Sequence, residues 1–340
     1  MSINPRTKSL VIFLAKVAVA ATLITWLVRS GVLKFDALKI FWQKPILLVA
    51  DLALFAFALV TGTLRWRTLL VLAGAKIPFW RAMQLQLTAL FFNVVVPGNV
   101  GGDVVKALYV ARDEDPSKRT TILLLVFVER LIGLGALVLV ASIVAVLNGS
   151  MLWQNPQLRQ LAMAVAFLGV CTLVGPALFV LAMRRAGDRL EAWTTGTTII
   201  AKLANRLVAS ARLLSAGPKH LLYALFPSMI AHTATILFFT VLTRVILAED
   251  VPFSSVATVY PLGILTMILP ISPAGLGVGH AAFDFLYKMI GLHDGATVFN
   301  VYLIGILTPC LSGVIPYLAL RRSGKLPTDE AATEGSAKTP

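Results

Sequence analysis

The sequence predicts an all-α, polytopic membrane protein with six full spans and two opposed broken or re-entrant helical elements, eight membrane segments in all. Three observations predict this class. Hydrophobic residues make up 58% of the chain and charged residues only 14%, with a mean hydropathy of +0.84, a balance foreign to soluble domains. Six apolar runs approach or exceed the roughly 20 residues that a crossing helix needs. Two further apolar stretches are interrupted by proline, glycine and polar residues.

The full spans are predicted from the length of each run, because about 20 helical residues cover a hydrocarbon core about 30 Å thick. The first run follows Arg6 and Lys8, as in a signal peptide, but it is too long for a signal's apolar region and no cleavage site follows it. The six predicted spans are 9–28, 45–63, 120–147, 160–183, 221–248 and 297–320.

The two interrupted stretches are 82–111 and 256–290. The break of the first lies in FNVVVPGNVGGDVVKALYVAR at 92–112, and that of the second in LTMILPISPAGLGVGHAAFDFLYK at 265–288. In the first, Pro97 removes a backbone donor and the glycines loosen the chain, so the helix is expected to break before Asp103. The freed peptide groups must face protein or water, since unpaired polar groups are costly in hydrocarbon. Interrupted segments in corresponding positions of two halves point to a transporter's binding site.

The distribution of Lys and Arg predicts the topology. When both interrupted stretches are re-entrant pairs of short helices, one side of the membrane carries 20 Lys and Arg and the other carries 6. Two single kinked spans would instead place the basic residues of 64–81 outside. The positive-inside rule favours re-entrance, with both termini in the cytoplasm of a bacterial inner-membrane protein. The two halves then form an inverted repeat, and their broken tips are expected to meet near the midplane.

A single transmembrane domain is expected over 1–322, followed by a disordered cytoplasmic tail at 323–340. The cytoplasmic loop 184–219 has apolar residues near helical spacing, which predicts an amphipathic helix that lies either on the anionic leaflet or on the protein itself. The net charge of +14 is spread over short loops between apolar runs. Topology and contact with anionic lipid account for it, and no nucleic-acid partner is expected.

Ionisable residues inside apolar runs are candidate functional residues, because charge is costly in hydrocarbon. Asp103 and Lys106 lie three apart, on one helix face, and are close enough to pair. Either Lys106 attracts a lipid phosphate while loop amides add donors, or the pair only neutralises the break. Glu129 and Arg130 are adjacent and face different ways. We expect separate partners for them: either Arg130 contacts a lipid phosphate and Glu129 a basic side chain, or both form structural pairs.

Other candidates are found near the second span and the second break. Arg65 either anchors the interface together with Trp66 or captures an inner-leaflet phosphate. His280 and Asp284 lie four apart and can pair, either structurally or in a proton-coupled step. The predicted lipid-headgroup residues are Arg65, Asn93, Asn99, Gly101, Gly102, Asp103, Lys106, Glu129, Arg130, Gly275, Gly277, His280 and Asp284.

Nothing in the sequence predicts catalysis. Cys171 and Cys310 lie inside apolar runs, the four histidines are dispersed, and no metal-ligand spacing, catalytic triad or P-loop is present. We therefore expect no enzymatic activity, no metal and no cofactor. Any transport would not be driven by hydrolysis in this chain.

Four motifs together resemble the membrane region of lysylphosphatidylglycerol synthases, which also occurs as free-standing flippase-like proteins. The motifs are LRWRTLL, VVPGNVGGDVVKALYVAR, VERLIGL and SPAGLGVGHAAFDFL, and the likeness covers roughly residues 10–320. The match is best at Pro97, Gly101, Gly102, Asp103, Lys106, Glu129 and Arg130. Many members carry an acidic residue after the second set of glycines, where this chain has His280.

The resemblance implies movement of a polar lipid between leaflets, since in the synthases this region moves aminoacylated phosphatidylglycerol outward. Only about 20 residues follow the last predicted span, so the aminoacyl-transferase activity is not expected here. The expected partners are membrane lipids: an anionic or modified phospholipid, or a hopanoid or glycolipid. The alternative is a non-transporting accessory subunit that docks a lipid-modifying enzyme or a glycosyltransferase, and a lipid-biosynthesis enzyme is then the expected protein partner.

Overall fold

Five segments of the structure, a computed structural model, are long and apolar enough to cross a membrane. The residues described are 38–95, 101–148, 156–194, 198–267 and 277–322, and within them all regular elements are helices. The segments are α3 (Pro45–Leu72), α6 (Pro116–Leu147), Arg159–Trp193 of α8 (Pro156–Trp193), α10 (Pro218–Leu247), and Gly295–Leu320, which joins α13 (Gly295–Leu311) to α14 (Val314–Arg322).

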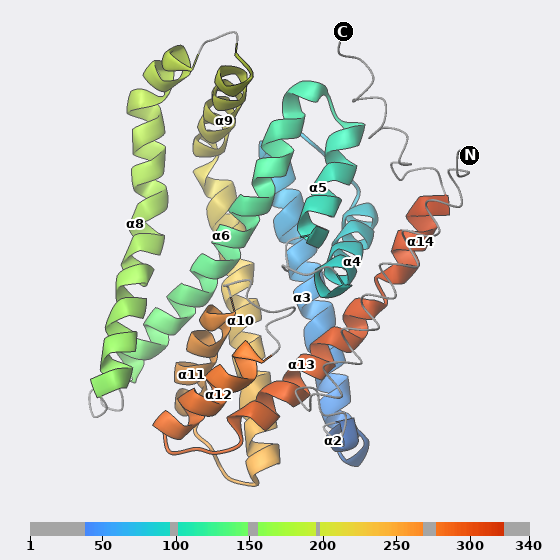
Figure 1. Cartoon of the computed structure of the whole chain (residues 1–340), viewed down its shortest axis with the longest axis vertical. Coiled ribbons are helices and arrows are strands. Elements are labelled where there is room, and N and C mark those ends of the chain that lie inside the picture. The colour runs from blue at the N-terminus through green and yellow to red at the C-terminus, as the bar shows by residue number, and fades with distance from the viewer. Residues whose placement is uncertain (1–37, 96–100, 149–155, 195–197, 268–276, 323–340) are drawn as a thin grey trace, which may run out of the picture.

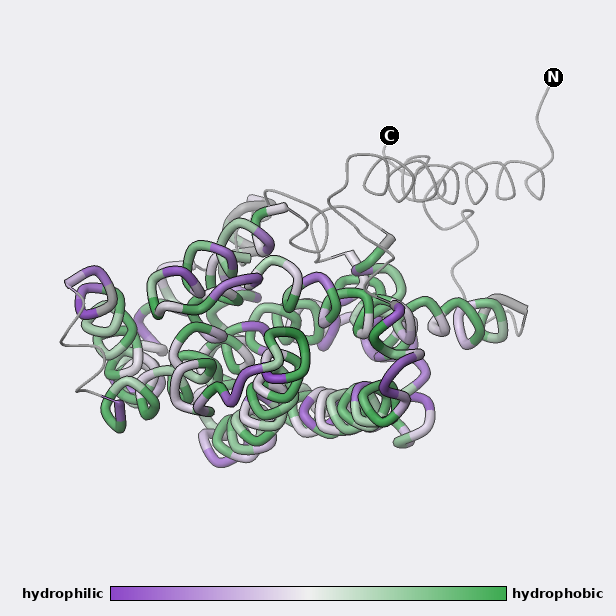
Figure 2. The backbone as a smooth tube through the Cα atoms, turned by 90° about the horizontal axis from the view of Figure 1, so that it is seen from below, coloured by the Kyte–Doolittle hydropathy of each residue, from purple (hydrophilic) through white to green (hydrophobic). Residues whose placement is uncertain are grey.

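The all-helical, multi-pass class is thereby confirmed (Figures 1 and 2). Five of the six predicted spans have a counterpart, and the first, 9–28, lies outside the described residues. The helix of the second span is longer than predicted. It runs on through LRWRTLL to Leu72, because neither glycine nor proline occurs between Thr63 and Gly74, which turns the chain with a φ of +68°. Arg65 therefore lies inside a helix rather than at its end.

Each interrupted stretch forms two short helices that pack against one another. The first gives α4 (Phe79–Val95) and α5 (Gly101–Asp113), and the second gives α11 (Phe253–Thr266) and α12 (Val278–Met289). The longest has 17 residues, about 26 Å at 1.5 Å per residue, short of the roughly 30 Å hydrocarbon core. The α4–α5 pair and the α11–α12 pair lie at opposite ends of the molecule (Figure 1).

The predicted amphipathic helix of the loop 184–219 is α9 (Ile199–Ala216), and it packs on the protein itself. Arg212 of α9 forms ion pairs with Asp188 at 2.7 Å and with Glu191, both on α8. Ser210 shares a hydrogen bond of 2.8 Å with Thr121 of α6. Helix α8 lies at the edge of the molecule (Figure 1). Only 11% of the residues in its most apolar 18-residue segment are buried, so most of that segment is exposed to the surroundings.

Two apolar cores hold the helices together, one toward each end. The first centres on aromatic rings of α10 to α13, where Phe283 stacks on Phe299 at 4.9 Å between ring centroids. The second surrounds Trp66, where α3, α5 and α6 meet. Packing is tight enough that a Cβ atom at Gly279 would lie 2.4 Å from the Phe299 ring. At this packing density, a larger side chain at position 279 would not fit without movement of its neighbours.

One buried carboxyl group lies outside any polar network in the described part of the chain. Asp51 of α3 is 2% exposed, and neither of its oxygen atoms has a hydrogen-bond partner. A Cβ atom at Gly305 of α13 would lie 2.7 Å from both oxygens. The glycine therefore gives this carboxyl group the space it occupies between α3 and α13.

Candidate functional site

Charged side chains from α3, α5 and α6 form a ladder of alternating sign inside the apolar body of the protein. Its members, in order of contact, are Arg65, Glu129, Lys106, Asp103 and Arg130. Glu129 lies ten residues beyond Arg119 along α6, about 15 Å deeper into the helix bundle. Three positive and two negative charges give the ladder a formal charge of +1.

Lys106 is the centre of the ladder. Its ammonium group donates to Glu129 Oε2 at 2.6 Å and to Gln86 Oε1 of α4 at 2.8 Å, and it lies 3.3 Å from Asp103 Oδ1. It also sits 4.7 Å from the centre of the Trp66 ring, within the range of a cation–π interaction. Since Lys106 is only 1% exposed, these four contacts replace its hydration.

The two arginines occupy the ends of the ladder. Arg65 donates from Nη2 to Glu129 Oε1 at 3.2 Å and from Nη1 to Ser228 Oγ of α10 at 3.0 Å. Arg130 donates to Asp103 Oδ2 from Nε at 3.1 Å and from Nη2 at 2.6 Å. Their side chains are 21% and 37% exposed, whereas Glu129 is 5% exposed. The ladder is thus closed at its centre and reaches the surface at its positively charged ends.

Arg65 also holds a donor without an acceptor. Among the residues that the structure describes, its buried Nε atom has no hydrogen-bond partner, although Nη1 and Nη2 both do. A buried donor without a partner costs about 1 to 3 kcal/mol, and more when it is charged. An oxygen atom of an anionic ligand would satisfy it.

Glycine at position 102 brings the ladder together. A Cβ atom there would lie 1.8 Å from the Ala89 carbonyl oxygen of α4, so a larger residue would push α5 away. The Gly102 amide donates to Asn93 Oδ1 at 2.9 Å, which satisfies one donor in the first turn of α5. Gly101 begins the helix. Lys106 then lies about one turn further on, opposite Gln86.

Several predicted contacts are confirmed. Asp103 and Lys106 pair, and Glu129 and Arg130 have separate partners, with basic side chains on Glu129. The prediction that Trp66 anchors the membrane interface is wrong, because its ring is fully buried against Lys106.

Two polar members of the site were missed by sequence reasoning, Gln86 and Ser228. Both helices contain several other polar residues, so nothing in the sequence singled out Gln86 or Ser228; their role depends on contacts with other helices.

The residues after the second break do not join the ladder. The predicted pairing of His280 with Asp284 is wrong: His280 Nε2 lies 3.3 Å from Asn300 Oδ1 of α13, and Asp284 pairs with Lys288 at 2.7 Å. A lysine one helical turn away is a better partner for an exposed carboxylate than a half-buried imidazole. Gly277, at a φ of +83°, precedes α12. Asn99 and Gly275 lie outside the described residues.

The chain matches a family model described as the lysylphosphatidylglycerol synthase TM region, over residues 13–320. No curated protein and no solved structure was found to match it. The family match covers nearly the whole chain and includes every member of the charged ladder. The protein therefore belongs to the lysylphosphatidylglycerol synthase transmembrane-region family.

Proposed function

We propose that this protein binds the headgroup of an anionic phospholipid at the charged ladder and carries it between the leaflets while the acyl chains stay in lipid. The buried Arg65 Nε atom, a donor without an acceptor at the end of a ladder of charge +1, carries this proposal. A phosphate oxygen would satisfy that donor. Membership of a family connected with membrane phospholipids agrees with lipid as the cargo.

The roles within the ladder follow from exposure and bonding. The two arginines reach the surface, and a guanidinium group offers several donors in a planar fork that suits phosphate oxygens. Lys106 is buried and already has three acceptors, so we assign it to positioning the ladder instead of to direct contact with phosphate. Asp103 and Glu129 hold the arginines in place. The protein needs no covalent chemistry for this task, and we propose that it is not an enzyme.

The proposed path depends on topology. We infer that α4–α5 enters the membrane from the cytoplasm and α11–α12 from the opposite side, as the halves of an inverted repeat in a bacterial inner membrane, with both termini cytoplasmic. Three observations support this: the helices are too short to cross alone, the pairs lie at opposite ends of the molecule, and the basic residues follow the positive-inside rule. A helix pair that ends within the membrane gives polar groups access to a lipid headgroup.

The test is translocation of labelled phosphatidylglycerol in vesicles that contain the purified protein. We expect Arg65→Gln and Arg130→Gln each to slow translocation about tenfold, since a charge-assisted contact to phosphate is lost. Arg81→Gln is the matched control, because Arg81 is also ion-paired and 23% exposed but lies outside the ladder. Equal rates for the wild type and both ladder variants would overturn the assignment.

A further inference from the structure

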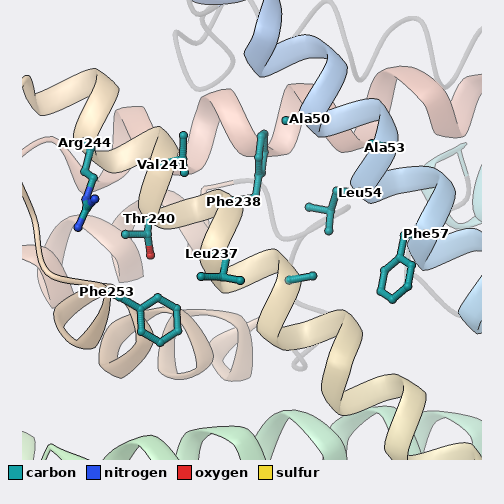
Figure 3. Close-up of a pocket in the computed structure, with 11 residues that line it drawn as sticks. Ala50, Ala53, Leu54, Phe57, Leu237, Phe238, Thr240, Val241, Arg244 and Phe253 are labelled. Atoms are coloured by element: carbon teal, nitrogen blue, oxygen red, sulfur yellow. The ribbon is translucent and has the colours of Figure 1, made fainter.

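A groove runs along the seam between α3 and α10, away from the charged ladder. It has a volume of about 560 Å³, within the range of small-molecule sites, and its lining is apolar apart from Thr240 and Arg244 (Figure 3). Thr240 donates its hydroxyl proton to the Ile236 carbonyl of its own helix. Arg244 is therefore the polar group that this groove, called here the α3–α10 groove, can offer to a ligand.

Two matching helix faces build the groove. On α3 the lining residues are Ala50, Ala53, Leu54 and Phe57, and on α10 they include Ala234, Leu237, Phe238 and Val241. Both sets follow the i, i+3, i+4, i+7 spacing of one helical face. The helices run antiparallel, and the alanines leave a hollow that the leucine and phenylalanine side chains wall in (Figure 3). The hollow is thus an apolar groove that follows the two helices.

Arg244 lies at one end of the lining, the same end as Phe253 at the start of α11 (Figure 3). Its Nε donates to the Val251 carbonyl at 2.8 Å, and Nη2 lies 3.2 Å from Asp250 Oδ1. The side chain of Asp250 is 90% exposed, and that of Arg244 is 45% exposed. Water screens such a pair, so it is weak, and an anionic oxygen of a ligand can compete for the guanidinium group.

We propose that the α3–α10 groove binds one acyl chain of an anionic phospholipid whose phosphate lies on Arg244. The lining residues of α10 from 234 to 244 extend about 15 Å along the helix, which suits an extended hydrocarbon chain. The lining also contains exposed hydrophobic side chains, including Leu237 and Val241, so the groove opens to the surrounding lipid. The apolar lining is complementary to an acyl chain, and the Arg244 guanidinium group is complementary to a phosphate.

This site is separate from the ladder. Ser228, which contacts Arg65, lies sixteen residues before Arg244 on α10, about 24 Å along the helix. That distance approaches the thickness of the hydrocarbon core. Arg244 therefore lies near the membrane surface opposite to that of Arg65, and the groove would bind lipid of that leaflet. The proposal concerns binding alone and holds whether or not the protein translocates lipid.

The test uses two photoreactive lipids that carry a diazirine at the end of one acyl chain: phosphatidylglycerol, and diacylglycerol as the probe without phosphate. Each is added to the purified full chain in detergent, and the adducts are mapped by mass spectrometry. In the wild type we expect adducts within 50–57 and 234–244, with phosphatidylglycerol about tenfold more efficient than diacylglycerol. Adducts elsewhere only, or equal labelling by both probes, would overturn the proposal.

Two variants separate the apolar and charged parts of the site. Ala234→Trp fills the hollow and should abolish labelling of the groove by both probes, whereas Leu173→Trp on the exposed face of α8 should not. Arg244→Gln should lower phosphatidylglycerol labelling to the diacylglycerol level, whereas Lys288→Gln, a lysine ion-paired on an exposed surface, should not. Thermal unfolding confirms that each variant is folded. Unchanged labelling in folded Ala234→Trp or Arg244→Gln would contradict the proposal.

Discussion

Lys106 shows how an ionisable side chain is accommodated in an apolar interior. Sequence spacing predicted its pair with Asp103 but not the order of the ladder, because that order depends on contacts between residues far apart in the chain. Lys106 and Glu129 are 23 positions apart, and Arg65 and Glu129 are 64 apart. Local spacing carries no information about such contacts.

The pair of Lys106 and Glu129 should behave as one unit in stability measurements. Lys106→Met removes the ammonium group that pairs with the buried Glu129 carboxylate. This change should destabilise the protein by about 3 to 5 kcal/mol. Adding Glu129→Gln removes the stranded charge, so the double variant should lose much less than the sum of the two single losses. Chemical unfolding in detergent of the wild type, the two single variants and the double variant measures the coupling energy between Lys106 and Glu129. Strictly additive losses of stability would show that this energy is zero.

Asp51 presents the opposite case, a buried carboxyl group with no partner. Asp51→Leu keeps the branching of the side chain and removes both unpaired oxygens, so we expect it to raise the thermal midpoint of unfolding. Thr63→Val, at a buried hydroxyl that bonds to the Leu59 carbonyl of the same helix, is the comparison and should not raise it. A lower midpoint for Asp51→Leu would show either that the carboxyl group has a stabilising contact or that the larger methyl groups clash with Gly305.

At the scale of the elements, most of the fold was predictable and the helix ends were not. Long apolar runs define crossing helices, and glycine with proline marks the two breaks. The extension of α3 to Leu72 was missed because the charged residues of LRWRTLL suggested an interface, whereas in the structure Arg65 pairs with Glu129 of α6 and Arg67 donates to the Ile77 carbonyl. Burial of charge by partners from other helices cannot be seen in one segment.

The contact between α4 and α5 gives the sharpest element-level prediction. Gly102→Ala places a methyl group against the Ala89 carbonyl and should destabilise the protein by about 3 kcal/mol, as overpacking does. Because α5 carries Asp103 and Lys106, the variant should also lose binding at the ladder. Gly175→Ala on α8, where no atom lies within 4 Å of the added methyl group, should be neutral or stabilising. Thermal unfolding of both variants distinguishes a specific clash from a general effect of alanine.

At the scale of the whole molecule, the predicted topology is based on the asymmetric distribution of charge in the sequence. The distribution of Lys and Arg predicts which loops share a side of the membrane. In Figure 1 the ends of α5 and α14 lie at one end of the molecule, and the ends of α10 and α12 lie at the other. This agrees with the predicted grouping of loops. The sequence does not predict how deeply the charged ladder is buried, because its burial depends on how α3, α5 and α6 pack together.

Cysteine labelling tests this arrangement. In a chain whose two native cysteines are replaced by alanine, Arg112→Cys at the end of α5 and His293→Cys after α12 present exposed thiols at opposite ends. A membrane-impermeant maleimide added to spheroplasts should label His293→Cys at once and Arg112→Cys only after permeabilisation. Labelling of both positions from the same side would refute the opposed entry of the two helix pairs.

The burial of Trp66 beneath the Lys106 ammonium group gives the protein an optical reporter of its own. The emission of an indole ring responds to a charge held 4.7 Å from its centre, and this ring is shielded from water. If the other five of the six tryptophans are replaced by phenylalanine, the indole emission that remains comes from Trp66 and responds to the position of the ammonium group. Any rearrangement of the ladder as lipid arrives can then be followed in real time without attaching a dye.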